Sequence, residues 1–134
     1  MTRRLEGPRL GGPRLGGKVA IVTGAGSAGP GWGNGKATAV LFAREGAKVL
    51  AADINLDAAL ETKRIIEGEG GICEAIAGDV SRAHDVASMV DACVAAFGRI
   101  DVLHNNVGIV EVGGPVETSE ESWDRVTDVN LKSS

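Results

Sequence analysis

The stretch that decides the fold is Val19-Ala-Ile-Val-Thr23, followed by Gly-Ala-Gly-Ser-Ala-Gly-Pro-Gly-Trp-Gly-Asn-Gly over residues 24–35. The first five residues are apolar and mostly β-branched, which is typical of a buried strand. Residues 36–45 (KATAVLFARE) are good helix formers, and Gly46 is a suitable helix end. Glycines let a phosphate approach the backbone, and the N–H groups of a helix start can receive it. The pattern therefore predicts a strand–loop–helix unit with a phosphate-binding loop.

Strands and helices continue to alternate along the chain. Further strands are expected at residues 47–53, 72–77 and 100–104, and further helices from Asn55 or Asp57 to about Glu67, from a cap at Ser81 to Phe97, and from a Thr118-x-x-Glu121 capping box onward. Such alternation indicates a parallel sheet with helices on both faces. Right-handed crossovers favour the strand order 3-2-1-4. We expect an α/β fold, a Rossmann-type doubly wound sheet, C-terminally truncated because the chain stops at Ser134 inside the last helix.

Polar residues follow each expected strand at its carboxyl end, where ligands of such sheets bind. These clusters are Thr23–Gly35, Asp53, Asp79 and Asn105–Gly108. A carboxylate at Asp53 can accept hydrogen bonds from both hydroxyl groups of an adenosine ribose and would repel a 2′-phosphate. Ile54 and Asn55 follow it, so no adjacent base neutralises such a phosphate. The sequence therefore predicts a dinucleotide whose adenosine ribose carries no 2′-phosphate.

A phosphate-binding NTPase loop, GxxxxGK[ST], is the rival interpretation of residues 29–36. The register does not fit, because Pro30 stands where the first glycine belongs and Ala37 follows Lys36. The hydroxyl needed for Mg²⁺ would come from Thr38, one position late. We therefore favour the dinucleotide-binding interpretation.

The combination of these motifs resembles the short-chain dehydrogenase/reductase family over residues 18–134. The residues on which the resemblance rests are Thr23-Gly24 with Gly33-Asn34-Gly35, then Asp53, Asp79-Val80, Asn105-Asn106-Val107-Gly108 and Val129-Asn130-Leu131. The resemblance implies a nicotinamide-dependent oxidoreductase that acts on an alcohol or carbonyl, and with Asp53 it implies NAD as the cofactor. The expected cofactor-binding residues are Gly24, Ser27, Gly33, Asn34, Gly35, Asp53, Ile54, Asp79, Val80, Asn106, Val107 and Gly108. Asn130 is the expected catalytic residue, in a kinked helix that helps to hold a proton-relay water.

Three departures from the family pattern stand out. The glycine turn carries about five extra residues, Ala28–Trp32, which we expect to bulge over the pyrophosphate, and Val107 replaces the alanine of NNAG. The family places its catalytic Ser and its YxxxK pair after Asn130, whereas this chain contains no Tyr. We therefore expect the cofactor-binding part of a dehydrogenase, inactive alone. The alternative is a non-catalytic dinucleotide-binding module or an inert fragment.

Composition limits the other possibilities. The 134 residues hold 14 Lys+Arg and 18 Asp+Glu, a net charge of −4, and 3% aromatic residues, which argues against nucleic-acid binding. We expect no membrane span and no metal site. Cys73 and Cys93 are expected to be buried thiols in a reducing cytoplasm. Residues 1–17 contain an Arg-Leu-x-Gly repeat and are expected to form a flexible extension, and full-length relatives are expected to be homo-oligomers.

Overall fold

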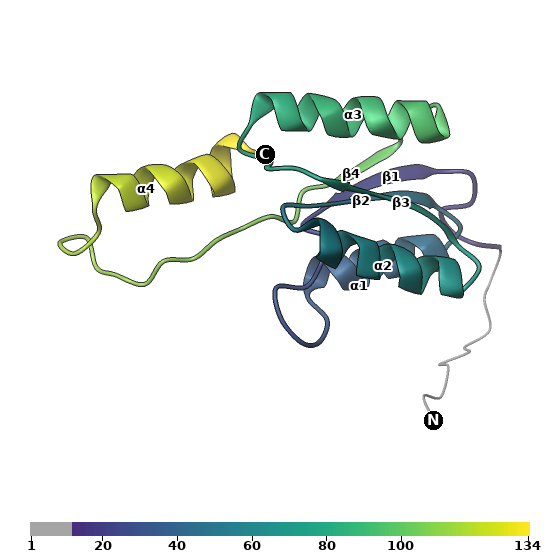
Figure 1. Ribbon diagram of the computed structural model, residues 1–134, viewed down its shortest axis with the longest axis horizontal. Coiled ribbons are helices and arrows are strands. Elements are labelled where there is room, and N and C mark those ends of the chain that lie inside the picture. Colours follow the sequence, from purple (N-terminus) through teal and green to yellow (C-terminus); the bar gives the residue numbers. More distant parts are fainter. Residues whose placement is uncertain (1–11) are drawn as a thin grey trace.

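A four-stranded parallel sheet in the order β3-β2-β1-β4 forms the centre of the fold (Figure 1). The structure is a computed structural model and describes residues 12–134. Its elements are β1 (Val19–Thr23), α1 (Asn34–Arg44), β2 (Lys48–Asp53), α2 (Leu56–Gly68), β3 (Ile72–Ala77), α3 (Ala83–Phe97), β4 (Val102–His104), α4 (Glu120–Thr127) and the π-helix η1 (Asp128–Lys132). The predicted strand order is therefore confirmed.

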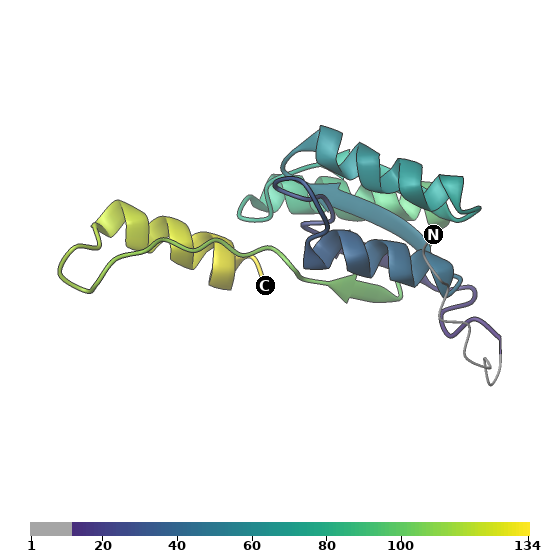
Figure 2. The same ribbon diagram turned by 90° about the horizontal axis from the view of Figure 1, so that it is seen from below.

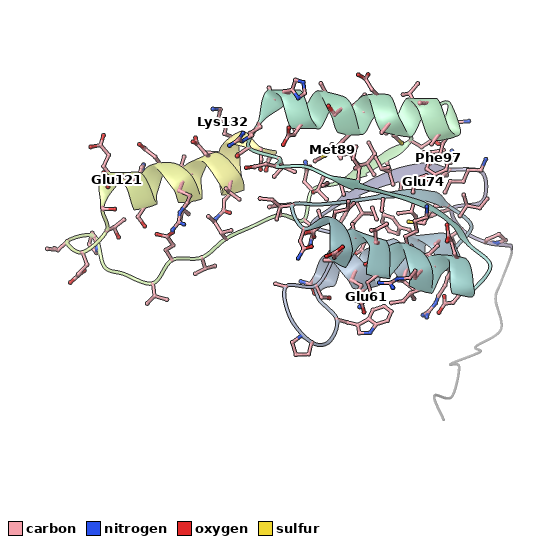
Figure 3. All side chains as sticks on the ribbon, in the orientation of Figure 1. Glu61, Glu74, Met89, Phe97, Glu121 and Lys132 are labelled. Carbon is pink, nitrogen blue, oxygen red and sulfur yellow. The ribbon has the colours of Figure 1, made fainter. Side chains whose placement is uncertain are left out.

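The helices cover both faces of the sheet (Figure 1). On one face, α1 and α2 pack Val40 and Ile66 against alternate residues of β1 and β2. On the other face, α3 packs Met89 and Cys93, and Met89 points toward the sheet in Figure 3. Cys73 belongs to the first of these two apolar clusters, so both thiols lie in the core, as predicted.

Two helix starts differ from the prediction. Helix α3 has its N-cap at Arg82 rather than Ser81, because the Ser81 hydroxyl donates to Asp79 Oδ1 at 2.6 Å. Helix α4 has its N-cap at Ser119 rather than Thr118, because the Thr118 hydroxyl donates to the Gly114 carbonyl at 2.8 Å. In both cases the hydroxyl of the predicted cap has a closer partner in the preceding turn.

Strands β1 and β3 have the predicted bounds, and those of α1 and β2 shift by one or two residues. Helix α2 begins after Asn55, whose Oδ1 accepts the Asp57 N–H at 3.0 Å. Strand β4 is shorter than predicted and begins at Val102. Residues 100–101 precede it, and Asp101 fixes this approach because its N–H donates to the Val19 carbonyl at 2.8 Å.

The segment before β1 makes a turn against the end of α1. The Leu15 N–H donates to the Glu45 carbonyl at 2.8 Å, the Arg14 guanidinium lies 3.4 Å from the Glu45 carboxylate, and Leu15 packs on the core. Gly46 permits this contact with φ +93°, and a Cβ there would lie 3.0 Å from Gly16 Cα. Residues 1–11 of the predicted flexible extension lie outside the described residues.

Helix α4 lies beyond the end of the sheet, at the end of an extended segment over residues 105–118 (Figures 1 and 2). None of the described helices covers the α3 face of β4, and Leu103 on that face is 58% exposed. Strand β4 pairs with β1, and among the described strands it has no partner on its other side. None of the helices in residues 12–134 combines the length and apolar character needed to cross a membrane.

Candidate functional site

Asp53 ends β2 at the carboxyl edge of the sheet, and its carboxylate organises two neighbouring backbone segments. Oδ2 accepts the Gly26 N–H and Oδ1 accepts the Asn55 N–H, both at 2.9 Å. Each carboxylate oxygen retains a further lone pair for another donor. The side chain is therefore held in place while it still has the capacity to bind two hydroxyl groups.

Gly24 and Asn106 join the ends of β1 and β4. The Asn106 amide donates to the Gly24 carbonyl at 3.3 Å, and its backbone N–H donates to Thr23 Oγ1 at 3.2 Å. Gly24 has φ +62°, a conformation that favours glycine, and a Cβ there would lie 3.3 Å from Val107 Cγ2. These contacts bring the two motifs together, although they lie 82 residues apart in the sequence.

The start of α1 lies directly against the same carbonyl. A Cβ on Gly35 would lie 1.9 Å from the Gly24 oxygen, so glycine is required there by the packing of the loop on the helix. Gly33 is the N-cap, and its N–H donates to Ser27 Oγ at 3.1 Å. The first helical bond runs from Ala37 to Gly33. The N–H groups of Asn34 and Gly35 thus belong to the first turn, where N–H groups have no intrahelical acceptor.

Asp79 follows β3 and is held by the turn after it. Its Oδ1 accepts the backbone N–H and the hydroxyl of Ser81, at 2.9 and 2.6 Å. The hydroxyl bond, followed by the backbone bond, lowers the pKa of Asp79 below its usual range. Its own N–H donates to Asp85 Oδ2 at 2.9 Å. Asp79 therefore presents an ionised carboxylate at neutral pH.

Asn130 lies at the centre of the π-helix η1 and fixes the chain after the NNVG motif. Its Oδ1 accepts the Ile109 N–H, and its Nδ2 donates to the Ile109 carbonyl, both at 2.8 Å. The side-chain amide is therefore committed to the backbone. A π-helical turn displaces backbone groups from the regular α-helical pattern. The change in helix type falls at the position where the resemblance implied a kink.

A cleft of about 940 Å³ runs along the carboxyl ends of the strands. Its lining includes most of the predicted cofactor-binding residues, namely Gly24, Ser27, Asp53, Ile54, Asp79, Val80, Asn106, Val107 and Gly108. Among the described residues, Gly33, Asn34 and Gly35 lie at the start of α1 outside this lining. Asn130 lines a second hollow of about 490 Å³ between α4 and the segment before it. Of the five extra residues, Ala28 lines the cleft, and their expected position over the pyrophosphate stays a prediction.

Two residues of the site were missed by the sequence analysis. Thr62 is fully buried on α2, and its hydroxyl donates to the Ala25 carbonyl of the Gly-rich loop at 2.7 Å. Arg125 reaches the cleft lining from α4 and pairs with Glu111. The threonine gave no periodic signal, although a hydroxyl on the buried face of a helix requires a partner. His104 packs edge-on against Phe42, with ring centroids 6.0 Å apart, as a structural histidine would.

Comparisons with known proteins agree with this geometry. A family model described as short chain dehydrogenase matches residues 18–134. An uncharacterized oxidoreductase of Thermotoga maritima is 46% identical over 115 residues, 86% of this chain and 43% of the relative. Cyclohexanol dehydrogenase of an Acinetobacter species is 42% identical, over 85% of this chain and 44% of the relative.

Solved structures show the same likeness. A short chain dehydrogenase from Mycobacterium smegmatis superimposes with a TM-score of 0.82 and 37% identity, covering 89% of this chain and 48% of the other. The chain belongs to the short-chain dehydrogenase family, whose curated relatives include dehydrogenases and other oxidoreductases. It spans less than half the length of these curated relatives.

Proposed function

We propose that this chain binds NAD(H) in the cleft at the carboxyl ends of the strands. In this proposal it is the cofactor-binding part of an oxidoreductase that acts on an alcohol or carbonyl. The observation that carries the proposal is the Asp53 carboxylate, which is anchored by Gly26 and Asn55 and lines the cleft. Its free lone pairs suit the two hydroxyl groups of an adenosine ribose. When bound, the nicotinamide supplies the site that gives or accepts a hydride.

The other residues of the cleft have complementary tasks in this proposal. The N–H groups at the start of α1 receive the pyrophosphate, favoured by the helix dipole. Asp79 and Val80 hold the adenine, and Asn106, Val107 and Gly108 line the cofactor between β1 and β4. Asn130 holds the backbone at Ile109, and the helix kink at this residue helps to hold a proton-relay water.

NAD is proposed over NADP because of charge. A 2′-phosphate at the ribose would lie against the Asp53 carboxylate, and like charges in a partly buried site repel by on the order of a few kcal/mol. The residues that follow Asp53 are Ile54 and Asn55, which supply no positive charge. The cleft therefore favours a ribose that carries two free hydroxyl groups.

Calorimetric titration with NAD and NADP tests the proposal. The native chain should bind NAD more tightly, and Asp53→Ala should narrow the difference between the two cofactors. Asp57→Ala is the matched control, because this exposed aspartate lies outside the cleft lining and should leave the preference unchanged. Equal or tighter binding of NADP by the native chain would overturn the assignment.

A further inference from the structure

Lys36 is a buried cation in the first turns of α1. Its side chain is 5% exposed, and its Nζ donates to Glu61 Oε1 on α2 at 3.2 Å. Lysine is seldom buried to this extent unless its charge is paired. Glu61, by contrast, is 57% exposed and lies on α2 (Figure 3). Lys36, near the start of the helix that follows the Gly-rich loop, is therefore the buried partner of this ion pair.

Trp32 supplies the second contact of this cation. The ammonium lies 5.1 Å from the centre of the Trp32 ring, within the range of a cation–π interaction. Trp32 is the last of the five extra residues, and Ser27 Oγ closes the base of the same loop by accepting the Gly33 N–H. The contacts of Trp32 and Lys36 thus bracket Gly33, Asn34 and Gly35, the residues that begin α1.

We propose that Trp32, Lys36 and Glu61 form a latch that holds the Gly-rich loop in the shape that receives a dinucleotide pyrophosphate. Lys36 is a positioning residue in this proposal, which rests on the proposed function. Glu61 ties the cation to α2, and the cation holds the Trp32 ring, so the extra segment is fastened against the helices instead of covering the cleft. The first-turn N–H groups at Asn34 and Gly35 are thereby kept in one geometry.

A direct role of Lys36 as a phosphate ligand is the competing explanation. Its Nζ already has the Glu61 carboxylate and the Trp32 ring as partners. Among the described residues, neither Lys36 nor Trp32 lines the cleft. The geometry therefore favours an indirect effect through the loop, which predicts that Trp32 and Lys36 variants have the same consequence.

The test compares ligands with and without a pyrophosphate on the full chain. Dissociation constants for ADP-ribose and adenosine are measured for Trp32→Leu, Lys36→Met, the double variant and Trp32→Phe. Lys63→Met is the matched control, because Lys63 Nζ also donates to a glutamate, Glu74 Oε2, at 3.2 Å, away from the loop. Urea unfolding of the same variants reports their stability.

Trp32→Leu and Lys36→Met should each weaken ADP-ribose binding by about three- to thirtyfold and change adenosine binding by less than about twofold. The double variant should lose no more than the larger single loss, because both residues serve one contact. Trp32→Phe keeps an aromatic face and should bind ADP-ribose nearly as the native chain does, and Lys63→Met should bind both ligands normally. Equal weakening for both ligands, or additive losses in the double variant, would overturn the latch.

A failure of the proposed function gives a different result. If the native chain binds neither ADP-ribose nor NAD, the proposed function fails, and the positioning role of Lys36 fails with it. Urea unfolding then tests whether the Trp32–Lys36 contact forms. Losses in the urea midpoint that do not add in the double variant support the Trp32–Lys36 contact, and additive losses overturn it.

Discussion

Gly35 and Gly24 meet so closely that a methyl group on the first would lie 1.9 Å from the carbonyl oxygen of the second. The same methyl group would lie 2.5 Å from Asn106 Nδ2, which donates to that carbonyl. The start of α1, the end of β1 and the turn after β4 are therefore packed at one point. This contact explains the glycine at position 35 by packing within the protein.

Gly35→Ala should destabilise the fold by about 2–3 kcal/mol or more, because backbone atoms of Gly24 must move to admit the methyl group. Urea unfolding measures the change. Gly29→Ala is the matched control in the same loop, where a Cβ meets nothing within 4 Å, and it should change stability by less than about 0.5 kcal/mol. Equal losses for the two variants would contradict the close contact.

Asp101 joins the start of β4 to β1 and should make the stability of the chain depend on pH. Its side chain bonds with Arg99 and accepts the Val19 N–H at 2.9 Å, and these contacts lower the pKa of the folded carboxyl. A carboxyl whose pKa is lower in the folded state than in the unfolded state stabilises the fold at pH values above its ordinary pKa of about 4. That stabilisation is lost as the pH falls through the lower pKa of the folded state.

Asp101→Asn should therefore lower the thermal midpoint at pH 7, and the difference from the native chain should shrink as the pH falls below about 4. Thermal melts at several pH values measure it. Asp91→Asn, on an exposed position of α3, is the control and should change the midpoint little. A difference for Asp101→Asn that stays constant down to low pH would contradict the assignment.

Leu103 should make the chain associate as its concentration rises. This residue is 58% exposed on the α3 face of β4, which none of the described helices covers, and exposed apolar surface favours association. Leu103→Lys should weaken the association by about tenfold, as measured by light scattering or sedimentation. Leu41→Lys, at a leucine that is 48% exposed on α1, should have little effect. A native chain that stays monomeric at all concentrations would contradict this prediction.

The 134-residue chain should show no turnover with NAD and a panel of alcohols, or with NADH and ketones. It contains no Tyr, and a positioned acid or base contributes about 10²- to 10⁴-fold to such a reaction. Asn130 is a neutral amide committed to Ile109, and His104 packs on Phe42. NADH absorbance is the measurement.

The same assay separates the two hypotheses for the whole protein. The chain is mixed with a separately made C-terminal segment of a relative that carries YxxxK. Activity only in the mixture would support the cofactor-binding part of an enzyme over a non-catalytic module. Activity of the chain alone that is lost in His104→Ala or Asn130→Ala would contradict the predicted inactivity.

The strand order could be predicted from the sequence because its signals are local. Short β-branched runs separated by helices allow few topologies once crossovers are right-handed. Helix caps were less predictable. Ser81 and Thr118 are residue types that commonly cap helices. The Ser81 hydroxyl instead donates to Asp79, and the Thr118 hydroxyl donates to Gly114 in the preceding turn. A hydroxyl takes the nearest suitable acceptor, and sequence spacing does not reveal that distance.

The sequence by itself determined the parallel sheet, its order, the Gly-rich loop and the place of Asp53 at the end of a strand. Only the tertiary structure decided that Lys36 is buried, because the sequence alone predicts that a lysine in the first turns of a helix is exposed to solvent. Its ammonium contacts the Trp32 ring and the carboxylate of Glu61, which lies 25 residues away on another helix. Periodicity reports which face of an element is apolar, whereas a buried charge is stable only where separate elements bring partners to it.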